Sequence, residues 1–341
     1  MRLMLACGGT GGHMFPALAL ADEFSDAGDD VMMVTDSRGI GFVPSGLEAR
    51  IVPSTAFFGR SVGDKFRSIA GYFKGKKESL ELIDTFSPQA VIGAGGYASF
   101  PVIRAAKKKR IPIFLLEQNS VPGRVTRLCA SSAREIYLGI PVVEGVSLKA
   151  RTVFTGNVLR RSVILVSRKE GKKILVLGGS GGARRLNYLG YELAQKFPRE
   201  KFIILTGRRD YPELKARPPL ANLELVEFTS HPEELYTQTR VAISRAGAIT
   251  LSELLVNGIP SILVPFPHAV DDHQLHNALW AHKANAAVMV PEQEIKRAEP
   301  LLKELIKDKA LRKKMGEQAH GLVPQDAARV IRERIEKCLA A

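Results

Sequence analysis

The stretch MRLMLACGGTGGHMFPALALA, residues 1–21, decides the fold of this 341-residue chain. An apolar run long enough for one buried strand leads into four glycines, and apolar residues at helical spacing follow, namely Ala17, Leu20, Ala21 and Phe24. The order strand, glycine turn, helix is typical of an α/β unit with a parallel sheet. Glycines let the backbone approach an anion closely, and the amides at a helix N-terminus favour negative charge. The stretch therefore predicts a phosphate-binding turn that opens an α/β domain.

The alternation of strands and helices occurs twice along the chain. Short apolar runs predict strands in the first half at residues 3–6, 31–35, 90–92, 113–116 and 135–138. They do so in the second half at residues 173–177, 202–206, 223–226, 241–244 and 261–264. The polar segment 153–171 predicts a crossover, with a domain boundary near Ser162. The chain is therefore expected to form two doubly wound α/β domains, residues 1–161 and 162–324, followed by an amphipathic helix at 325–341 that the pattern assigns to neither domain.

The composition is that of a globular protein, with 45% hydrophobic and 25% charged residues. Three widely spaced cysteines, Cys7, Cys129 and Cys338, favour neither a disulfide framework nor a zinc site, and they fit a reducing cytoplasm. The N-terminal apolar run is too short for a signal peptide, and no apolar stretch is long enough to span a membrane. A net charge of +14 indicates an anionic partner, or merely a solvated basic surface.

Two further glycine-rich loops follow predicted strands, GAGGYAS at residues 93–99 and GGSGGA at residues 178–183. None of the three loops carries the lysine of a Walker loop, which disfavours nucleoside triphosphate hydrolysis. The second loop satisfies a relaxed dinucleotide fingerprint through Gly93, Gly95 and Ala98, with Glu117 at the end of the next strand. An NAD-dependent oxidoreductase is therefore an alternative that the residues leave open.

The segment SRAGAITLSELLVNGIPSILVPFPHAVDDHQLHNA, residues 244–278, holds the densest set of polar groups. A helix beginning near Ala248 places Glu253 where a carboxylate can bind a ribose diol, while the first helix amides face a diphosphate. A capping box formed by Thr250 and Glu253 explains the same residues equally well. The loop that follows carries Asp271, Asp272, His273 and Gln274 just past a strand end, where ligands bind in parallel sheets. This mixture favours sugar hydroxyls over a metal.

Seven motifs in order carry a resemblance to a known family across nearly the whole chain: GGTGGHMFPALALA, GAGGYASFPV, EQNSVPGRVTRL, GNVLR, LVLGGSGGARRLN, SRAGAITLSE and PFPHAVDDHQLHNA. The chain resembles the MurG family, bacterial enzymes that transfer N-acetylglucosamine (GlcNAc) from UDP-GlcNAc to undecaprenyl-linked muramoyl pentapeptide. This reaction converts lipid I into lipid II in peptidoglycan synthesis. Cousins with the same architecture, such as another lipid glycosyltransferase or a UDP-GlcNAc epimerase, stay open as alternatives.

The resemblance implies a GT-B architecture, which is two Rossmann-like domains facing across a cleft. The acceptor then belongs to the N-terminal domain, onto which the helix at 325–341 packs back, and the donor belongs mainly to the C-terminal domain. The implied donor-binding residues are Thr10, Gly11, Gly12, Asn119, Arg160, Ser180, Thr229, Arg245, Ala248, Ile249, Thr250, Leu251, Ser252, Glu253 and Gln274. Two positions depart from the family pattern: Gly181 stands where glutamine is usual and Val158 where proline is usual.

Transfer with inversion needs one base to deprotonate the acceptor 4-hydroxyl. His13 is the expected base because histidine titrates near neutrality and its loop is expected to open toward the cleft. His13 could instead hydrogen-bond within its loop or hold an acceptor phosphate, and Glu117 and Tyr97 are the reserve candidates. No cofactor and no obligatory metal site are expected, because helix amides and cationic side chains suffice to stabilise the departing UDP.

The segment AFFGRSVGDKFRSIAGYFKGKK, residues 56–77, mixes aromatic and basic residues in a way that suits an anionic bilayer surface. The expected membrane-associating residues are Phe57, Phe58, Phe66, Ile69, Tyr72, Phe73, Lys74, Lys76 and Lys77. An ordinary helix whose aromatic side chains are core is the alternative. The lipid-linked acceptor favours a peripheral protein at the cytoplasmic face of the inner membrane, with UDP-GlcNAc, lipid I and the anionic membrane surface as partners and no nucleic acid.

Overall fold

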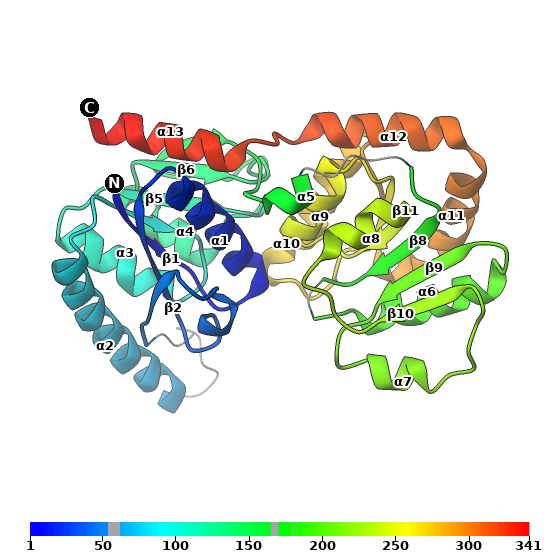
Figure 1. Cartoon of the computed structure of the whole chain (residues 1–341), viewed down its shortest axis with the longest axis horizontal. Coiled ribbons are helices and arrows are strands. Elements are labelled where there is room, and N and C mark those ends of the chain that lie inside the picture. Colours follow the sequence, from blue (N-terminus) through cyan, green and yellow to red (C-terminus); the bar gives the residue numbers. More distant parts are fainter. Residues whose placement is uncertain (54–61, 165–169, 180, 341) are drawn as a thin grey trace. The chain divides into compact units, whose positions relative to one another are not determined.

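The computed structural model describes residues 1–53, 62–164, 170–179 and 181–340, and within residues 62–70 it describes the backbone alone. The chain folds as two compact units (Figure 1). Unit 1 comprises Met1–Arg160 together with Asp326–Ala341, and unit 2 comprises Arg161–Gln325.

Unit 1 is built on a seven-stranded sheet with the order β3-β2-β1-β4-β5-β6-β7. Its strands are β1 (Arg2–Ala6), β2 (Asp30–Thr35), β3 (Glu48–Ile51), β4 (Ala90–Gly93), β5 (Ile113–Glu117), β6 (Glu135–Leu138) and β7 (Arg151–Phe154), and every pair is parallel. The chain winds outward from β1 to β3 and then returns to pair β4 with β1 on its other side. The direction therefore switches between β1 and β4, which is where open parallel sheets bind ligands.

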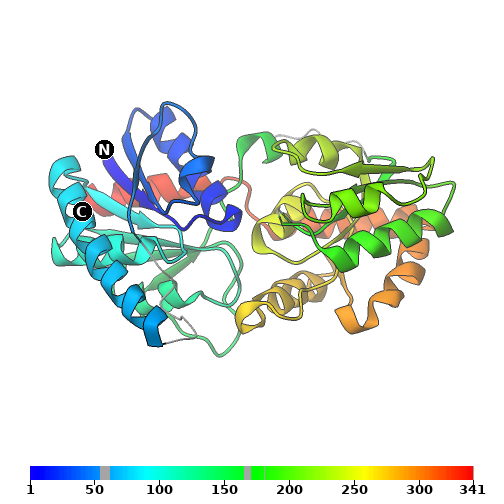
Figure 2. The ribbon, with the colours of Figure 1, turned by 90° about the horizontal axis from the view of Figure 1, so that it is seen from below.

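Alternate residues of the strands in unit 1 feed two hydrophobic layers. Leu3 and Leu5 pack with α1 (Gly11–Asp26) and α13 (Ala327–Ala340), whereas Met4 and Ala6 pack toward α2 (Val62–Phe86), α3 (Ser99–Lys108) and α4 (Arg124–Cys129). Figures 1 and 2 show these helices covering the two faces of the sheet. Burial on both faces requires near-continuous apolar strands, as the sequence of β1 provides. This rigid sheet fixes the positions of the loops at its carboxyl edge.

Unit 2 repeats the arrangement with a six-stranded parallel sheet in the order β10-β9-β8-β11-β12-β13. The strands are β8 (Lys173–Leu177), β9 (Lys201–Leu205), β10 (Leu223–Val226), β11 (Thr239–Ser244), β12 (Ser261–Leu263) and β13 (Val288–Met289). The helices are α5 (Arg161–Ile164), α6 (Arg184–Lys196), α7 (Tyr211–Lys215), α8 (Pro232–Gln238), α9 (Ala248–Val256), α10 (His273–Lys283), α11 (Ala298–Lys307) and α12 (Lys309–Leu322). Its direction switches between β8 and β11.

The expected fold class, two doubly wound parallel α/β sheets, is confirmed. Every predicted strand is present, and the sheets gain β3, β7 and β13, which the apolar pattern did not predict. The expected crossover at 153–171 begins inside β7, so its first residues are strand. Over the described ranges, every helix is too short or too polar to cross a membrane.

Candidate functional site

Two glycine loops of unit 1 meet at its switch point, after β1 and after β4. The amide of Gly8 donates to the carbonyl oxygen of Gly95 over 2.9 Å. Gly95 and Gly96 have φ values of +93° and +76°, and a Cβ atom on Gly96 would lie 2.5 Å from Cα of Gly8. These glycines are therefore required for the close packing of the two loops, which accounts for the fingerprint-like spacing of residues 93–98 without a dinucleotide.

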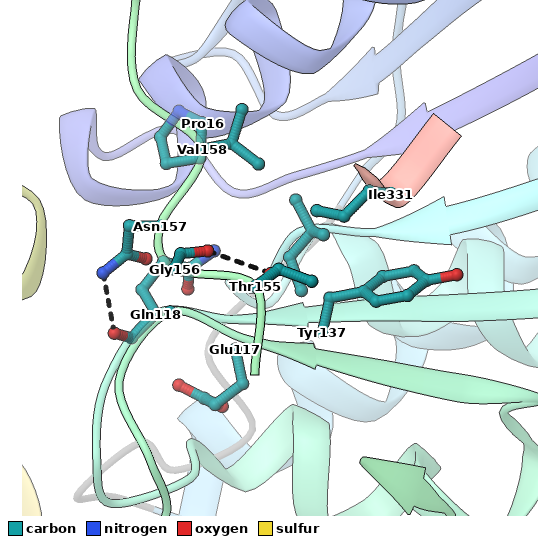
Figure 3. A pocket seen from close by; sticks show the side chains of 11 residues that line it. Pro16, Glu117, Gln118, Tyr137, Thr155, Gly156, Asn157, Val158 and Ile331 are labelled. Atoms are coloured by element: carbon teal, nitrogen blue, oxygen red, sulfur yellow. Dashed lines mark hydrogen bonds between the residues drawn. The ribbon is translucent and has the colours of Figure 1, made fainter. Parts of the chain in front are cut away.

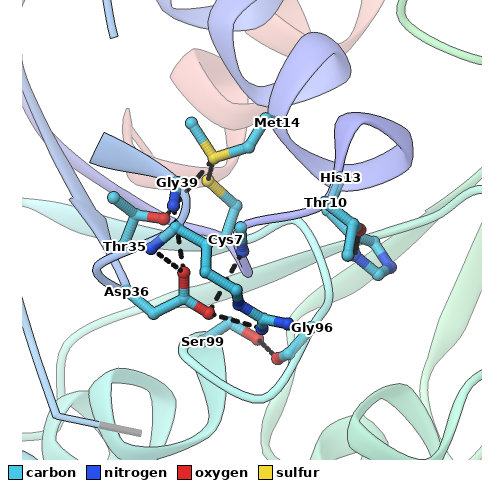
Figure 4. A network of polar contacts seen from close by, with 11 residues as sticks. Cys7, Thr10, His13, Met14, Thr35, Asp36, Gly39, Gly96 and Ser99 are labelled. Carbon is cyan, nitrogen blue, oxygen red and sulfur yellow. Dashed lines mark hydrogen bonds and ion pairs between the residues drawn. The ribbon is translucent and has the colours of Figure 1, made fainter. Parts of the chain in front are cut away.

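His13 stands in the first turn of α1, half-buried between the two loops (Figure 4). Its Nδ1 atom lies 2.9 Å from Oγ1 of Thr10. A Cβ atom on Gly95 would come within 2.7 Å of Cδ2 of the imidazole, so a larger residue there would displace the ring. The hydrogen bond within the loop, which the sequence left as an alternative role, is therefore present, and it fixes the orientation of the ring. The same contact suits a base, because a base needs a fixed orientation toward the proton that it removes.

Glu117 ends β5 and is buried beneath the loop that follows it. Its Oε1 accepts from the amide of Asn119 over 3.1 Å, and its Oε2 accepts from the amide of Gly123 over 2.8 Å. Burial raises the pKa of Glu117 above its ordinary value, although hydrogen bonds from Thr126 and the two amides oppose the rise. The carboxylate thus shapes the EQNSVPG loop and positions Asn119. Tyr97, the other reserve candidate, lies half-buried just before α3.

The remaining residues predicted to bind the donor from unit 1 lie at the ends of β1 and β7. Thr10 and Gly12 are exposed and Gly11 is half-exposed at the N-terminus of α1. The guanidinium of Arg160 lies over the ring of Phe15, 5.0 Å from its centroid. A small pocket at the carboxyl ends of β5, β6 and β7 is lined by Glu117, Gln118, Asn157 and other residues (Figure 3). The carboxyl edge of this sheet therefore gathers every unit 1 residue that the sequence predicted for catalysis or donor binding.

In unit 2 the loops after β8, β9, β11 and β12 lie at one carboxyl edge. The helix α9 begins after Gly247, and no described side chain caps its first amides. These amides belong to Ala248, Ile249 and Thr250. Leu251 and Ser252, which were also predicted to bind the donor, follow them in the same helix. Ser180, predicted to contact the diphosphate, lies outside the described residues. A Cβ atom on Gly181 would have open space within 4 Å, so this departure from the family pattern leaves room for a side chain.

Glu253 is held by a tyrosine that the sequence did not single out. The Tyr236 hydroxyl donates to its Oε2 over 2.7 Å, and Glu253 is 8% exposed. The capping-box alternative is wrong, because α9 begins at Ala248 and places Thr250 inside the helix instead of at its cap. Tyr236 lies 17 residues earlier, on α8, and nothing local in the sequence links the two.

The loop after β12 is strained next to Gln274. Asp271 and Asp272 adopt left-handed φ values of 53° and 52°, a region that residues other than glycine visit rarely. Oε1 of Gln274 accepts from the amide of Phe266 over 3.0 Å, which orients the side-chain amide. In the part of the chain that the structure describes, no group of three His, Cys, Asp or Glu residues is arranged to hold a metal ion.

Arg245 differs from the expectation that it meets the diphosphate. It is 7% exposed, pairs with Glu292 and donates from Nη1 to the carbonyl oxygens of Val264 and Pro265 over 3.1 and 3.2 Å. Burial lowers the pKa of Arg245 despite the Glu292 carboxylate. The guanidinium therefore supports the loop that leads to Gln274. The Thr229 side chain is engaged within its own turn, because its Oγ1 accepts from the amide of His231 over 2.9 Å.

The segment expected at the membrane falls partly on described residues of α2. Phe57 and Phe58 lie outside them, and of Phe66 and Ile69 only the backbone is described. Tyr72 packs on Phe100 of α3, with ring centroids 5.4 Å apart, whereas Phe73 is 63% exposed. Lys74, Lys76 and Lys77 lie on the same helix, with Lys74 and Lys77 exposed and Lys76 half-exposed. One aromatic side chain therefore matches the core interpretation and its neighbour the surface interpretation.

Comparison with known proteins covers both units. Residues 3–138 match the Glycosyltransferase family 28 N-terminal domain, and residues 173–333 match the Glycosyltransferase family 28 C-terminal domain. The chain is 34% identical, over an aligned length of 360 residues and 97% of each protein, to the UDP-N-acetylglucosamine–N-acetylmuramyl-(pentapeptide) pyrophosphoryl-undecaprenol N-acetylglucosamine transferase of Geobacter metallireducens.

Solved structures share the fold. The chain superposes on MurG of Acinetobacter baumannii with a TM-score of 0.80 and 24% identity, covering 98% of this chain and 99% of the other. It superposes on the UDP-GlcNAc 2-epimerase of Neisseria meningitidis with a TM-score of 0.69 and 14% identity, covering 99% and 100%. At these identities the likeness establishes the GT-B architecture alone, which enzymes of different activity share.

Proposed function

Because the chain belongs to glycosyltransferase family 28, and within it to the MurG enzymes, we propose that it transfers GlcNAc from UDP-GlcNAc to the 4-hydroxyl of the muramoyl sugar in lipid I. The product is lipid II, and the protein is a hexosyltransferase of peptidoglycan synthesis. The observation that carries this function is the identity of 34% across 97% of the chain, which includes both units. An oxidoreductase is no longer an alternative.

The donor is assigned chiefly to unit 2. The N-terminal amides of α9 suit the diphosphate, because helix N-termini carry partial positive charge and unpaired donors. Glu253 suits the ribose diol, and its hydrogen bond from Tyr236 supports this role by fixing the carboxylate on one oxygen. Gln274 suits the sugar hydroxyls, because its Oε1 contact with Phe266 turns the amide group in one direction.

The base is assigned to His13 of unit 1. Its imidazole removes the proton of the acceptor hydroxyl as the oxygen forms its bond to the anomeric carbon, and the bond from that carbon to UDP breaks on the opposite side. The proton stays on the ring until solvent accepts it, and the diphosphate leaves as an anion. The contact between His13 and Thr10 supports this assignment, whereas Glu117 has both carboxylate oxygens engaged by loop amides.

Radiolabelled UDP-GlcNAc with a lipid I analogue tests the function directly. We expect His13→Gln to lower kcat by roughly 100- to 10,000-fold with little change in donor affinity. Glu253→Gln should instead weaken UDP binding, and Tyr236→Phe should weaken it less, because it removes only the hydroxyl that orients the carboxylate. Full turnover by His13→Gln would remove it as the base, and unchanged UDP binding by Glu253→Gln would remove the ribose contact.

We further propose that the protein associates peripherally with the anionic cytoplasmic face of the inner membrane through α2. Phe73 is an exposed aromatic residue beside three lysines, a combination that inserts a ring at the headgroups while cations meet the lipid charge. Each nearby lysine contributes on the order of 1 kcal/mol.

Co-sedimentation with vesicles containing anionic lipid tests this surface. Replacing Lys74, Lys76 and Lys77 by glutamine should weaken binding on the order of 100-fold, and Phe73→Ser should weaken it further. The matched control is Leu128→Ser, because Leu128 is an apolar side chain 60% exposed on α4. Equal binding by the wild type and the lysine variant, or an equal loss in the Leu128 control, would contradict the assignment to α2.

A further inference from the structure

Asp36, at the end of β2, lies directly beneath the glycine loop that carries His13 (Figure 4). It is 6% exposed, and its Oδ2 accepts from the amide of Gly9 over 3.3 Å and from Nη2 of Arg38 over 2.8 Å. Its Oδ1 accepts from the amides of Arg38 and Gly39, each over 3.0 Å. One buried carboxylate therefore joins its own turn, residues 36–39, to the loop after β1.

The two segments are in contact too close for any side chain at Gly9. A Cβ atom there would lie 2.2 Å from Oδ1 of Asp36 and 2.5 Å from the amide nitrogen of Gly39. A Cβ atom on Gly39 would lie 2.0 Å from Oγ1 of Thr35 and 3.1 Å from Cα of Gly9. Gly9 is therefore held both by the hydrogen bond and by shape.

Burial disfavours the charged form of such a carboxylate, yet Asp36 stays charged. Burial tends to raise its pKa, but hydrogen bonds from Arg38, Gly39 and Gly9 outweigh that effect and lower the pKa below its ordinary value. The group is thus an ionised acceptor at neutral pH, and charge-assisted hydrogen bonds to backbone amides are stronger than neutral ones.

Thr10 connects Gly9, which Asp36 holds, to the imidazole of His13. Thr10 follows Gly9 directly and its Oγ1 lies 2.9 Å from Nδ1 of His13. On the far side, the ring rests against Gly95, and the amide of Gly8 is tied to that second loop. The His13 ring therefore lies between the loop after β4 and Thr10, and the residue before Thr10 is hydrogen-bonded to Asp36.

We propose that Asp36 is a positioning residue, which fixes the orientation of the His13 ring through Gly9 and Thr10. The catalytic consequence rests on the proposed function, in which His13 is the base. The effect on the orientation of the His13 ring does not rest on that function, because it is measured in the protein without substrate.

Asp36→Asn is the sharpest variant. It keeps one oxygen to accept from the amides of Arg38 and Gly39, but it replaces the oxygen facing Gly9 by a donor. The matched control is Asp30→Asn, the same change at the opposite end of β2, where the side chain is 75% exposed. If Asp36→Asn does not fold, Asp36→Glu tests the same link, because it keeps the charge and moves it by one methylene.

Imidazole NMR of the ligand-free protein, with the His13 signals assigned by their loss in His13→Gln, gives the first result. We expect Asp36→Asn to shift those signals toward a free imidazole and Asp30→Asn to leave them in place. In the lipid I assay, Asp36→Asn should lower kcat roughly 10- to 100-fold, as for a misplaced catalytic group. In a double-mutant cycle, Asp36→Asn should lower kcat by less than a further twofold in the Thr10→Val background. The reason is that both changes break the same path from Asp36 to His13.

Unchanged His13 signals in the Asp36 variant would overturn the proposal, and so would kcat losses that multiply in the cycle. The outcome is separable from the proposed function. If the wild-type protein makes no lipid II analogue while the His13 signals shift as expected, the function fails and the positioning of the ring stands.

Discussion

At the residue scale, the site depends on glycines that allow two loops to touch. Gly96→Ala should destabilise unit 1 by about 1–3 kcal/mol, because φ is +76° and the new methyl would lie 2.5 Å from Cα of Gly8. It should also lower kcat, since the same methyl approaches Nδ1 of His13 at 3.3 Å. Urea unfolding and the transfer assay measure the two effects.

Gly41→Ala is the control for this prediction, because a Cβ atom on Gly41 would meet nothing within 4 Å. It should leave the unfolding midpoint almost unchanged. A Gly96 variant as stable and as active as the control would show that the loops can separate without cost.

Residues that act through neighbours in sequence were predictable, and those that act through distant partners were not. Thr10 and His13 lie three residues apart at the start of one helix. The motif GGTGGH therefore places them together wherever it joins a strand to a helix. The environment of Arg245 depends on Glu292, which lies beyond the next two strands, β12 and β13. In the sequence, a positive charge beside a glycine turn indicates an anion site. In the folded unit, Arg245 instead supports a loop. No local pattern distinguishes these two uses of an arginine.

At the element scale, the buried strands were predictable, whereas of the four edge strands only β10 was predicted. The interior strands are covered on both faces and therefore read as apolar runs. β3 and β7 close the two edges of their sheet and keep most side chains exposed, as in the sequences EARI and RTVF. β13 consists of two residues at the edge of the other sheet. Edge strands are short and polar because they limit unwanted pairing, so they lack the signal that identifies a strand.

The attachment of α13 to unit 1 depends on a buried carboxylate, Glu135 of β6. Arg334 donates to its two oxygens over 2.8 and 2.6 Å, and Arg151 lies at 3.5 Å. The hydrogen bonds from Arg334 lower the pKa of Glu135 below its ordinary value, although burial opposes the shift. A lowered pKa means that the charged carboxylate stabilises the folded state above its ordinary pKa, and that this stability is lost as pH falls through the lowered value.

We therefore expect Glu135→Gln to cost about 2 kcal/mol at pH 7 and the difference from wild type to shrink as pH falls below about 4. Urea unfolding at several pH values measures both quantities. Glu333→Gln, which breaks an exposed pair with Arg329 on the same helix, should cost less than about 1 kcal/mol. A pH-independent loss in the Glu135 variant would mean that its packing matters and its charge does not.

At the scale of the whole molecule, the last helix of the chain returns to the unit that contains the first strand. Unit 1 contains both termini, and unit 2 is one continuous run between them. The amphipathic spacing of the last helix predicts a buried stripe, but the stripe alone does not say which sheet it covers. Ile331 and Ile335 lie in the core cluster that also contains Phe114 and Tyr137, which settles the assignment through packing.

This division predicts that loss of the last helix separates the two binding roles. Ending the chain at Gln325 removes the buried Ile331 and Ile335, and large-to-small changes at such sites each cost about 2–5 kcal/mol. Unit 1 should then unfold at a lower temperature. The α9 amides, Glu253 and Gln274, which are proposed as the main donor contacts, lie in unit 2, so UDP should still raise the unfolding temperature of that unit.

Calorimetry with and without UDP measures both transitions, and a chain ending at Leu339 is the control for truncation itself. Loss of UDP protection together with α13 would mean that the nucleotide depends on unit 1 for most of its affinity. Retained protection with abolished transfer to the lipid I analogue is the expected outcome. It follows because the proposed base, His13, stands on the helix against which α13 packs.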